Sequence, residues 1–308
     1  MRVYLQAGLA VALVALGGCK TSDSKGVALA SSMERYIPAD TVVLAGVRVD
    51  QIKTTPLYQK LMEGQKLGEL DQFAKRTGLD PRRDVDEFVL ASNGKKSVAI
   101  ARGRIANRAA LEDAMVKEGA TKQAFGKYNL VGKDGYAVVF VDDTIALAGQ
   151  PELLKPLLEA EPAKGDAKSA VLERVAAMQQ ARQVWAVAIG GFAPVPLPET
   201  GNLANLNRVF QSLEDVAMTM DLKDGLHLNA AGTCNDEKNA RQLHDLLRGL
   251  IGFGRLSTPS DRPDLLRLLD GIRVDHNNRN VKLDAQVPME LVDTLLATSE
   301  GKRPKKTE

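Results

Sequence analysis

The chain has 308 residues and a formal net charge of +2; 44% of its residues are hydrophobic and 4% are aromatic. A nucleic-acid-binding protein needs a strongly basic surface, so the near balance of acidic and basic residues argues against one. The few aromatic residues argue against surfaces that bind sugars or single strands by stacking. The length predicts one large domain or two ordinary domains.

The first element is a short apolar segment from Leu5 to Gly18, preceded by the positive charge of Arg2. A positive charge, a short apolar region and an exit of small residues form the layout of a secretory signal peptide. A transmembrane helix needs about 20 apolar residues, and this segment is shorter. The sequence therefore predicts a signal peptide over residues 1–18.

The end of this segment, Leu16-Gly17-Gly18-Cys19, resembles the lipobox of bacterial lipoproteins. Small residues let a peptidase take the extended backbone into a narrow site, and a cysteine thiolate is the nucleophile that joins a diacylglyceryl group. The resemblance implies that Cys19 is the lipid attachment site, carrying acyl chains such as palmitate, and the mature N-terminus. It also implies anchoring in the cell envelope on the periplasmic side. Lys20 follows the cysteine, as in lipoproteins exported to the outer membrane, but inner versus outer membrane stays open.

Residues 19–33 are predicted to form a lipidated, flexible tether, which as a random coil spans on the order of 20 Å. Removal of residues 1–18 takes away only Arg2 among the charged residues, so 40 basic residues (41 − 1) face 39 acidic ones and the net charge is +1. With Cys19 lipidated, Cys234 has no cysteine partner, so the body depends on packing rather than on an internal disulfide. Cys234 is either a reactive thiol beside a helix N-terminus or a small buried hydrophobe.

Residues 34–162 are predicted to form a first α+β half. In order, it contains a strand, helical segments, a hairpin, a helix, a second hairpin, a short strand and a closing helix. These elements begin near Thr41, Thr55, Asp86, Asn107, Tyr128, Thr144 and Pro151. Asn93-Gly94 favours the tight turn of the first hairpin, while Asn107 and Gly119 are typical of the start and end of the helix.

Residues 167–299 repeat this order as a second α+β half, and residues 300–308 form a basic disordered tail. The repeated elements begin near Gln183, Leu203, Glu214, Asn235, Ile272 and Pro288. The pattern predicts two tandem, similar halves with antiparallel sheets and helices packed on one face. Each half is compatible with a ferredoxin-like arrangement, and the alternative is one sheet shared by both halves. In the second half, alternation places His227 and Asn229 on the strand face opposite Leu226 and Leu228.

Two short motifs at the start of the body, Ile37–Asp40 and Thr55–Tyr58, resemble the entry into uncharacterised bacterial envelope lipoproteins. This resemblance implies an architecture and no activity.

The sequence offers few residues for chemistry. His227, Cys234, His244 and His276 are too widely and irregularly spaced for a zinc signature, and we expect no metal and no cofactor. Acidic pairs occur at Asp84/Asp86, Asp142-Asp143 and Glu214-Asp215. Adjacent strand residues point to opposite faces, so such pairs do not converge by themselves.

We therefore expect a non-catalytic envelope lipoprotein that mediates protein contacts or envelope assembly. Its partners would be the membrane, through the anchor, and an envelope protein that the sequence does not identify. The alternative is a small-ligand-binding lipoprotein with a site between the two halves. A third hypothesis is a hydrolase that uses two carboxylates, which would need two such side chains in one pocket.

Overall fold

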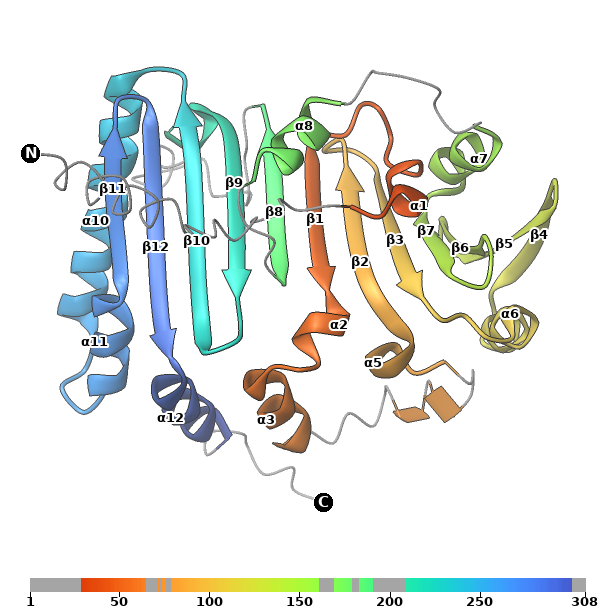
Figure 1. Cartoon of the computed structure of the whole chain (residues 1–308), viewed down its shortest axis with the longest axis horizontal. Helices are drawn as coiled ribbons and strands as arrows, with labels where there is room; N and C mark the ends of the chain where they lie inside the picture. The colour runs from red at the N-terminus through yellow and green to blue at the C-terminus, as the bar shows by residue number, and fades with distance from the viewer. Residues whose placement is uncertain are drawn as a thin grey trace, which may run out of the picture.

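The computed structural model describes residues 29–64, 71–72, 74–75, 79–160, 169–178, 183–190 and 209–300. Its strands are β1 (Val43–Arg48), β2 (Val85–Ser92), β3 (Ser97–Gly103), β4 (Thr121–Phe125), β5 (Tyr128–Lys133), β6 (Tyr136–Phe140), β7 (Ile145–Gly149), β8 (Val184–Ile189), β9 (Leu213–Asp221), β10 (Gly225–Cys234), β11 (Ile272–Asn277) and β12 (Asn280–Pro288). They form one antiparallel sheet in the order β11-β12-β10-β9-β8-β1-β2-β3-β7-β6-β5-β4 (Figure 1). The α+β class is confirmed, in the form of a shared sheet.

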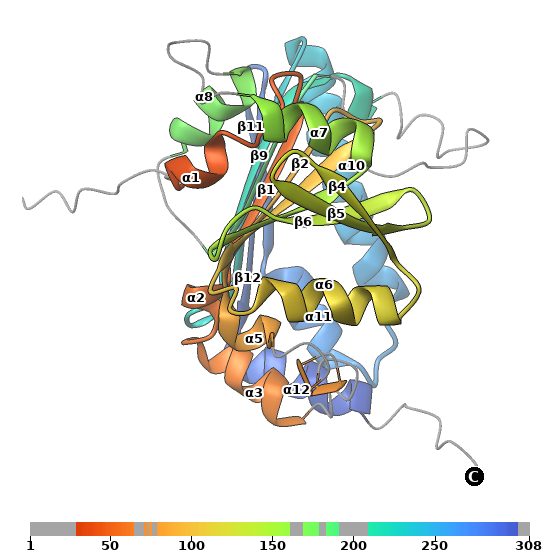
Figure 2. The same ribbon diagram turned by 90° about the vertical axis from the view of Figure 1, so that its right-hand side faces the viewer.

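Helices contact both faces of the sheet, whereas the sequence pattern predicts helices on one face. They are α1 (Ser31–Glu34), α2 (Val49–Ile52), α3 (Pro56–Gly64), α5 (Pro81–Asp84), α6 (Arg108–Lys117), α7 (Pro151–Glu159), α8 (Ala170–Ala176), α10 (Glu237–Ser257), α11 (Pro263–Asp270) and α12 (Met289–Glu300). Figure 2 shows α1, α7 and α8 on one side of the sheet and α6 and α10 on the other. No helix among the described residues combines the length and the apolar character that crossing a bilayer requires.

Strand alternation defines the two faces, which we name face A and face B. On face A, Leu44, Val89 and Leu147 belong to the main core, together with Leu154 of α7 and Val171 of α8. The side chains of Leu44, Val89 and Leu147 are fully buried. Face A of the first half is therefore closed by helices.

Face B is covered over the second half by α10. Leu243 of this helix packs in one cluster with Val274 of β11, Val281 of β12 and Cys234 of β10. Over the end of the first half, Leu111 of α6 forms a smaller cluster with neighbouring apolar side chains. The two halves thus bury opposite faces most completely.

The halves meet where β1 pairs with β8. Gly46 lies opposite Trp185, whose side chain is fully buried. A Cβ added at position 46 would lie 2.3 Å from the indole ring, so glycine is required for the ring to lie across the strand. Backbone pairing and one indole ring therefore fill the junction between the halves. The ligand-binding hypothesis expects a cleft at this place.

Local expectations hold at the turns and caps. Gly94 has a positive φ of 85° in the first hairpin, and Gly119 has φ 93° after α6. The Asn107 side chain accepts a hydrogen bond from the Ala110 amide at 3.2 Å, as a helix cap does.

Other expectations need correction. The sequence pattern matches β11–β12 to the hairpin that begins at Tyr128, which is β5–β6. In the sheet the counterpart is β6–β7, because β12 lies beside β10 just as β7 lies beside β3. Strands β4 and β5 have no counterpart in the second half. The short helix α11 has no counterpart among the predicted elements. Most of the helix expected from Leu203 to Leu213, the anchor residue Cys19 and the tail 301–308 lie outside the described residues.

Candidate functional site

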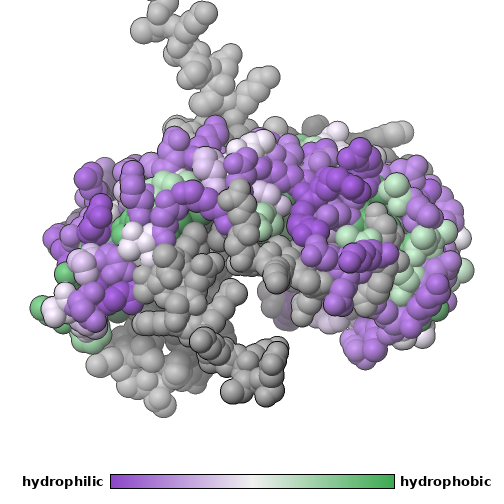
Figure 3. All heavy atoms as spheres, turned by 90° about the horizontal axis from the view of Figure 1, so that it is seen from below, coloured by the Kyte–Doolittle hydropathy of each residue, from purple (hydrophilic) through white to green (hydrophobic). Residues whose placement is uncertain are grey.

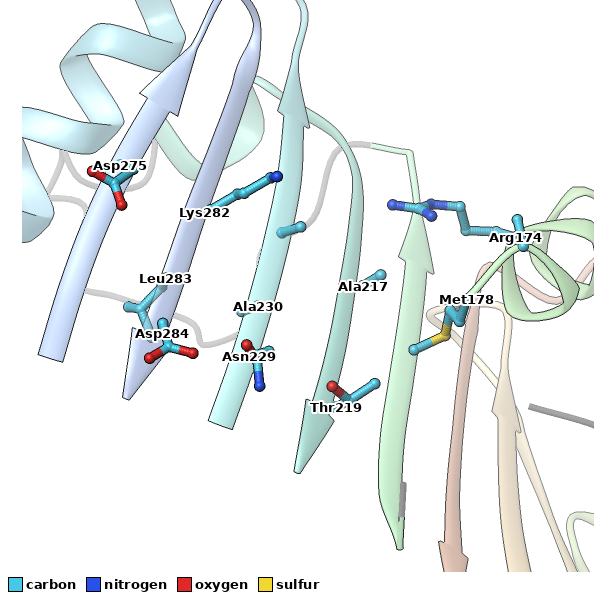
Figure 4. Close-up of a pocket in the computed structure, with 12 residues that line it drawn as sticks. Arg174, Met178, Ala217, Thr219, Asn229, Ala230, Asp275, Lys282, Leu283 and Asp284 are labelled. Atoms are coloured by element: carbon cyan, nitrogen blue, oxygen red, sulfur yellow. The ribbon is translucent and has the colours of Figure 1, made fainter. Parts of the chain in front are cut away.

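A groove of about 580 Å³ lies on face A of the second half. Strands β9 to β12 form its floor and α8 forms one wall (Figure 4). The lining residues are Arg174, Ala177, Met178, Ala217, Thr219, Asn229, Ala230, Ala231, Asp275, Lys282, Leu283 and Asp284. All of them belong to the second half, so this groove lies within one half rather than between the two.

The alternating sequences of β10 and β12 build the floor. Successive strand residues point to opposite faces, so Asn229, Lys282 and Asp284 lie on face A while their apolar neighbours lie on face B against α10. Ala217 and Ala231 keep the middle of the floor low because their side chains are single methyl groups. The predicted placement of His227 and Asn229 opposite Leu226 and Leu228 agrees with this register.

Charges of both signs are distributed across the groove. Arg174 Nε of α8 lies 3.0 Å from Asp215 Oδ1 of β9, an ion pair that fixes the wall to the floor. On the far side, Asp275 of β11 is directly opposite Lys282 of β12. The groove therefore presents fixed polar and charged groups at known positions along rigid strands.

Two carboxylates, Asp275 and Asp284, line this one groove, as the hydrolase hypothesis requires. Carboxylate catalysis usually depends on one acid that an apolar pocket keeps protonated. Asp275 is exposed, and the residues opposite Asp275 and Asp284 are Lys282 and Arg273. The groove has the two carboxylates but not the apolar burial.

Two of the three histidines lie together, and the third lies on the other face of the sheet. The rings of His244 and His276 lie 4.6 Å apart, and His244 Nδ1 is 2.9 Å from Asp245 Oδ1. His227 lies on face A, across the sheet from the other two. In the part of the chain that the structure describes, no group of three metal-ligating side chains forms.

Cys234 is fully buried between the sheet and α10. Burial raises the pKa of its thiol, and the smaller effect of a hydrogen bond with Ser212 does not cancel this. A raised pKa leaves less of the nucleophilic thiolate. Of the two interpretations that the sequence leaves open, the geometry supports the small buried hydrophobe.

Two other acidic candidates, Asp142 and Asp84, have structural partners. Asp142 Oδ1 accepts hydrogen bonds from the amides of Thr144 and Ile145 at 2.7 and 2.9 Å, which is the expected turn. Asp84 is held by Arg83, with an Nε to Oδ1 distance of 2.9 Å.

No protein-family model matches the chain, and no curated protein matches it either. Among solved structures it is similar to TP0453 in crystal form III, with a TM-score of 0.47 and 9% identity, covering 86% of this chain and 97% of that chain. Crystal form I gives a TM-score of 0.45 and 9% identity, over 86% of this chain and 96% of that chain. These likenesses carry no functional argument, so function is argued from the residues of this chain.

Sequence reasoning did not single out Arg174, Asp275, Lys282 or Asp284 as a group. The alternation in residues 281–288 was a usable signal, since it separates Lys282 and Asp284 from the apolar residues between them. The link to Arg174 depends on how α8 packs, which no local pattern gives.

Proposed function

We propose that this protein is a lipid-anchored component of the bacterial cell envelope that acts by contacting another envelope protein, without catalysis. The observation that carries the proposal is the groove on face A of the second half. Its polar side chains stand on strands, so they are held in place without a partner, which lowers the entropic cost of binding.

The width of the groove favours a protein partner over a small molecule. Four neighbouring strands at about 4.8 Å spacing extend over roughly 14 Å. A small-molecule site normally encloses most of its ligand, whereas this groove has one helical wall and a sheet floor. Charges of both signs, such as Asp275 and Lys282, fit a polar protein surface with complementary charges.

The anchor is supported by the order Leu16-Gly17-Gly18-Cys19 and the short apolar segment before it. One acyl chain gives only marginal membrane binding, and two or three give stable anchoring. A tether that follows Cys19 and ends before Leu29 and α1, which pack on the main core, would hold the groove within a few nanometres of the membrane. This restricts its partners to membrane-associated and nearby envelope proteins.

Site-specific photo-crosslinking in cells tests the contact. A photoreactive residue at Asn229, exposed on the groove floor, should give a discrete crosslinked product that the same residue at Gln242, exposed on α10, does not give. Asp275→Lys should weaken the product at Asn229. Equal crosslinking from both positions, or none from Asn229, would remove the basis for a partner at this groove.

A separate experiment tests the anchor. Cells fed labelled palmitate should incorporate label into the wild-type protein and not into Cys19→Ser. Absence of label from the wild type would refute the lipid attachment while leaving the crosslinking result interpretable.

A further inference from the structure

A second groove, of about 410 Å³, lies on face B of the first half, between the end of α6 and strands β2, β3, β7, β6 and β5. Its lining comprises Leu90, Ser97, Ala99, Met115, Ala120, Val131, Gly132, Lys133, Tyr136, Ala137, Val138, Ala148 and Gly149. It lies in the other half and on the other face from the groove used by the proposed function, and it stands independently of that function.

The groove is apolar and open to solvent. Ala99 and Ala148 form a low floor, since methyl side chains leave space above the strands, and Met115 of α6 stands beside them. Two of its lining side chains, Leu90 and Tyr136, are 37% and 60% exposed. Large apolar side chains that stay exposed together commonly mark a binding surface, and the volume falls within the range of ligand sites.

One end of this apolar surface is basic. The register places Gly149, Ala137 and Gly132 in one row across the strands, and Ser97 precedes Val98, which pairs with Gly149. Exposed Lys96 precedes Ser97 and exposed Lys133 follows Gly132, and Lys133 itself lines the groove. Within the described residues neither lysine forms an ion pair. Along the chain, Asp134 follows Lys133 directly, in the turn between β5 and β6.

The remaining lining is aliphatic or aromatic, apart from the Ser97 and Tyr136 hydroxyls and the backbone. An apolar trough with positive charge at one end matches a molecule with a single alkyl chain and an anionic head group. The alkyl chain of the ligand would lie over Ala99 and Ala148, where it would shield the exposed parts of Leu90 and Tyr136 from water. The head group would remain at the solvent-exposed end, beside the Lys133 ammonium group, which forms no ion pair within the described residues.

We propose that this groove binds a single-chain amphiphile with an anionic head group, the alkyl chain lying on Ala99 and Ala148 and the head group at Lys133. Burial of alkyl carbon contributes about 0.8 kcal/mol per CH₂, so the chain supplies most of the affinity. The lysine supplies the preference for an anion.

Isothermal titration calorimetry tests the proposal with three probes of equal alkyl-chain length, each used below its critical micelle concentration. The probes are dodecanoate, dodecyl phosphate and uncharged dodecanol. Comparison of the first two shows whether the groove prefers a carboxylate or a phosphate head group. The titrated protein starts at Lys20, because acyl chains on Cys19 would compete with the probes for the groove. This truncation removes no described core residue, since the first residue packed against the core is Leu29. An exposed ion pair is worth up to about 1 kcal/mol, so one or both anions should bind about fivefold more tightly than dodecanol.

Four variants complete the test. Lys133→Gln should abolish the preference for anions and leave dodecanol binding unchanged, whereas Lys223→Gln, in the exposed β9–β10 turn, should behave as wild type. Ala148→Leu should weaken all three probes by filling the groove. Leu90→Ser does the same by removing a partly exposed contact, and serves if Ala148→Leu fails to fold by circular dichroism.

Three results would overturn the proposal. Failure of every probe to reach saturable binding excludes an alkyl chain here, as does unchanged binding in the folded groove variants. An anion preference that survives Lys133→Gln places the head group elsewhere.

Discussion

Replacement of Gly46 by alanine should destabilise the protein at the junction of its halves. The new Cβ would lie 2.3 Å from Cε2 and Cζ2 of Trp185 and 2.5 Å from its Nε1, whereas real Cβ contacts essentially never come under 3.0 Å. The ring is fully buried and packed in the main core, so either the indole or strand β1 must move by roughly an ångström in a close-packed interior.

The expected loss follows from two opposing effects. Overpacking of a core typically costs about 1–3 kcal/mol. Alanine also restricts the unfolded chain, which returns about 0.4–1 kcal/mol where the backbone conformation allows it. We expect Gly46→Ala to lower the free energy of unfolding by about 2 kcal/mol, and the urea midpoint by about 1 M.

Urea titrations followed by circular dichroism and by the emission of the single tryptophan measure this loss. Gly252→Ala is the matched control, because nothing lies within 4 Å of a Cβ on that helical glycine. This control should gain up to about 1 kcal/mol. The double variant Gly46→Ala/Trp185→Phe should lose less than the two single losses added together. A Gly46→Ala protein as stable as the wild type would refute the packing of the indole over β1.

Three further predictions concern single buried side chains. Cys234 should resist a thiol reagent at neutral pH in the folded protein and react fully in guanidinium, and fast reaction in the folded state would contradict its burial. A side-chain hydrogen bond from Arg83 lowers the pKa of Asp84 below 3.8; the stability it contributes is present above about pH 4 and lost as pH falls through the folded-state pKa. Asp84→Asn should therefore lose about 1.5–3 kcal/mol at pH 7 and show a flatter stability profile below pH 4, measured by urea titration at each pH. Leu154→Ala, at a position with no exposed surface, should cost about 2–5 kcal/mol in the same assay.

Local sequence patterns were sufficient to predict most of the helices, strands and turns. Positive-φ glycines after Asn93 and after α6, and the cap at Asn107, are each determined by a few neighbouring residues. Strand pairing is decided over longer distances. The sequence pattern matches the β5–β6 hairpin to β11–β12, and β5 and β6 do pair, so only the position of β7 beside β3 shows that β6–β7 is the counterpart.

The candidate site was predictable in part. Alternation in β10 placed Asn229 on the correct face, and the same reasoning applied to β12 would have added Lys282 and Asp284. Whether that face is open or covered depends on where a helix packs. The sequence shows that α10 has an apolar stripe but not that the stripe rests on face B, which leaves face A for the groove.

Helix length explains why two similar halves leave different faces open. At 1.5 Å per residue, the 21 residues of α10 extend about 31 Å, and the 10 residues of α6 only about 15 Å. The longer helix covers face B of the second half, whose open face A is polar. The shorter helix leaves apolar strand residues of the first half open beside it, such as Leu90, while α7 and α8 close face A there. Figure 3, viewed from below, shows polar and apolar surface at both ends of the molecule rather than one apolar face. A repeated unit with helices of unequal length thus acquires two chemically different binding surfaces, which mutations at Asn229 and Lys133 can test separately.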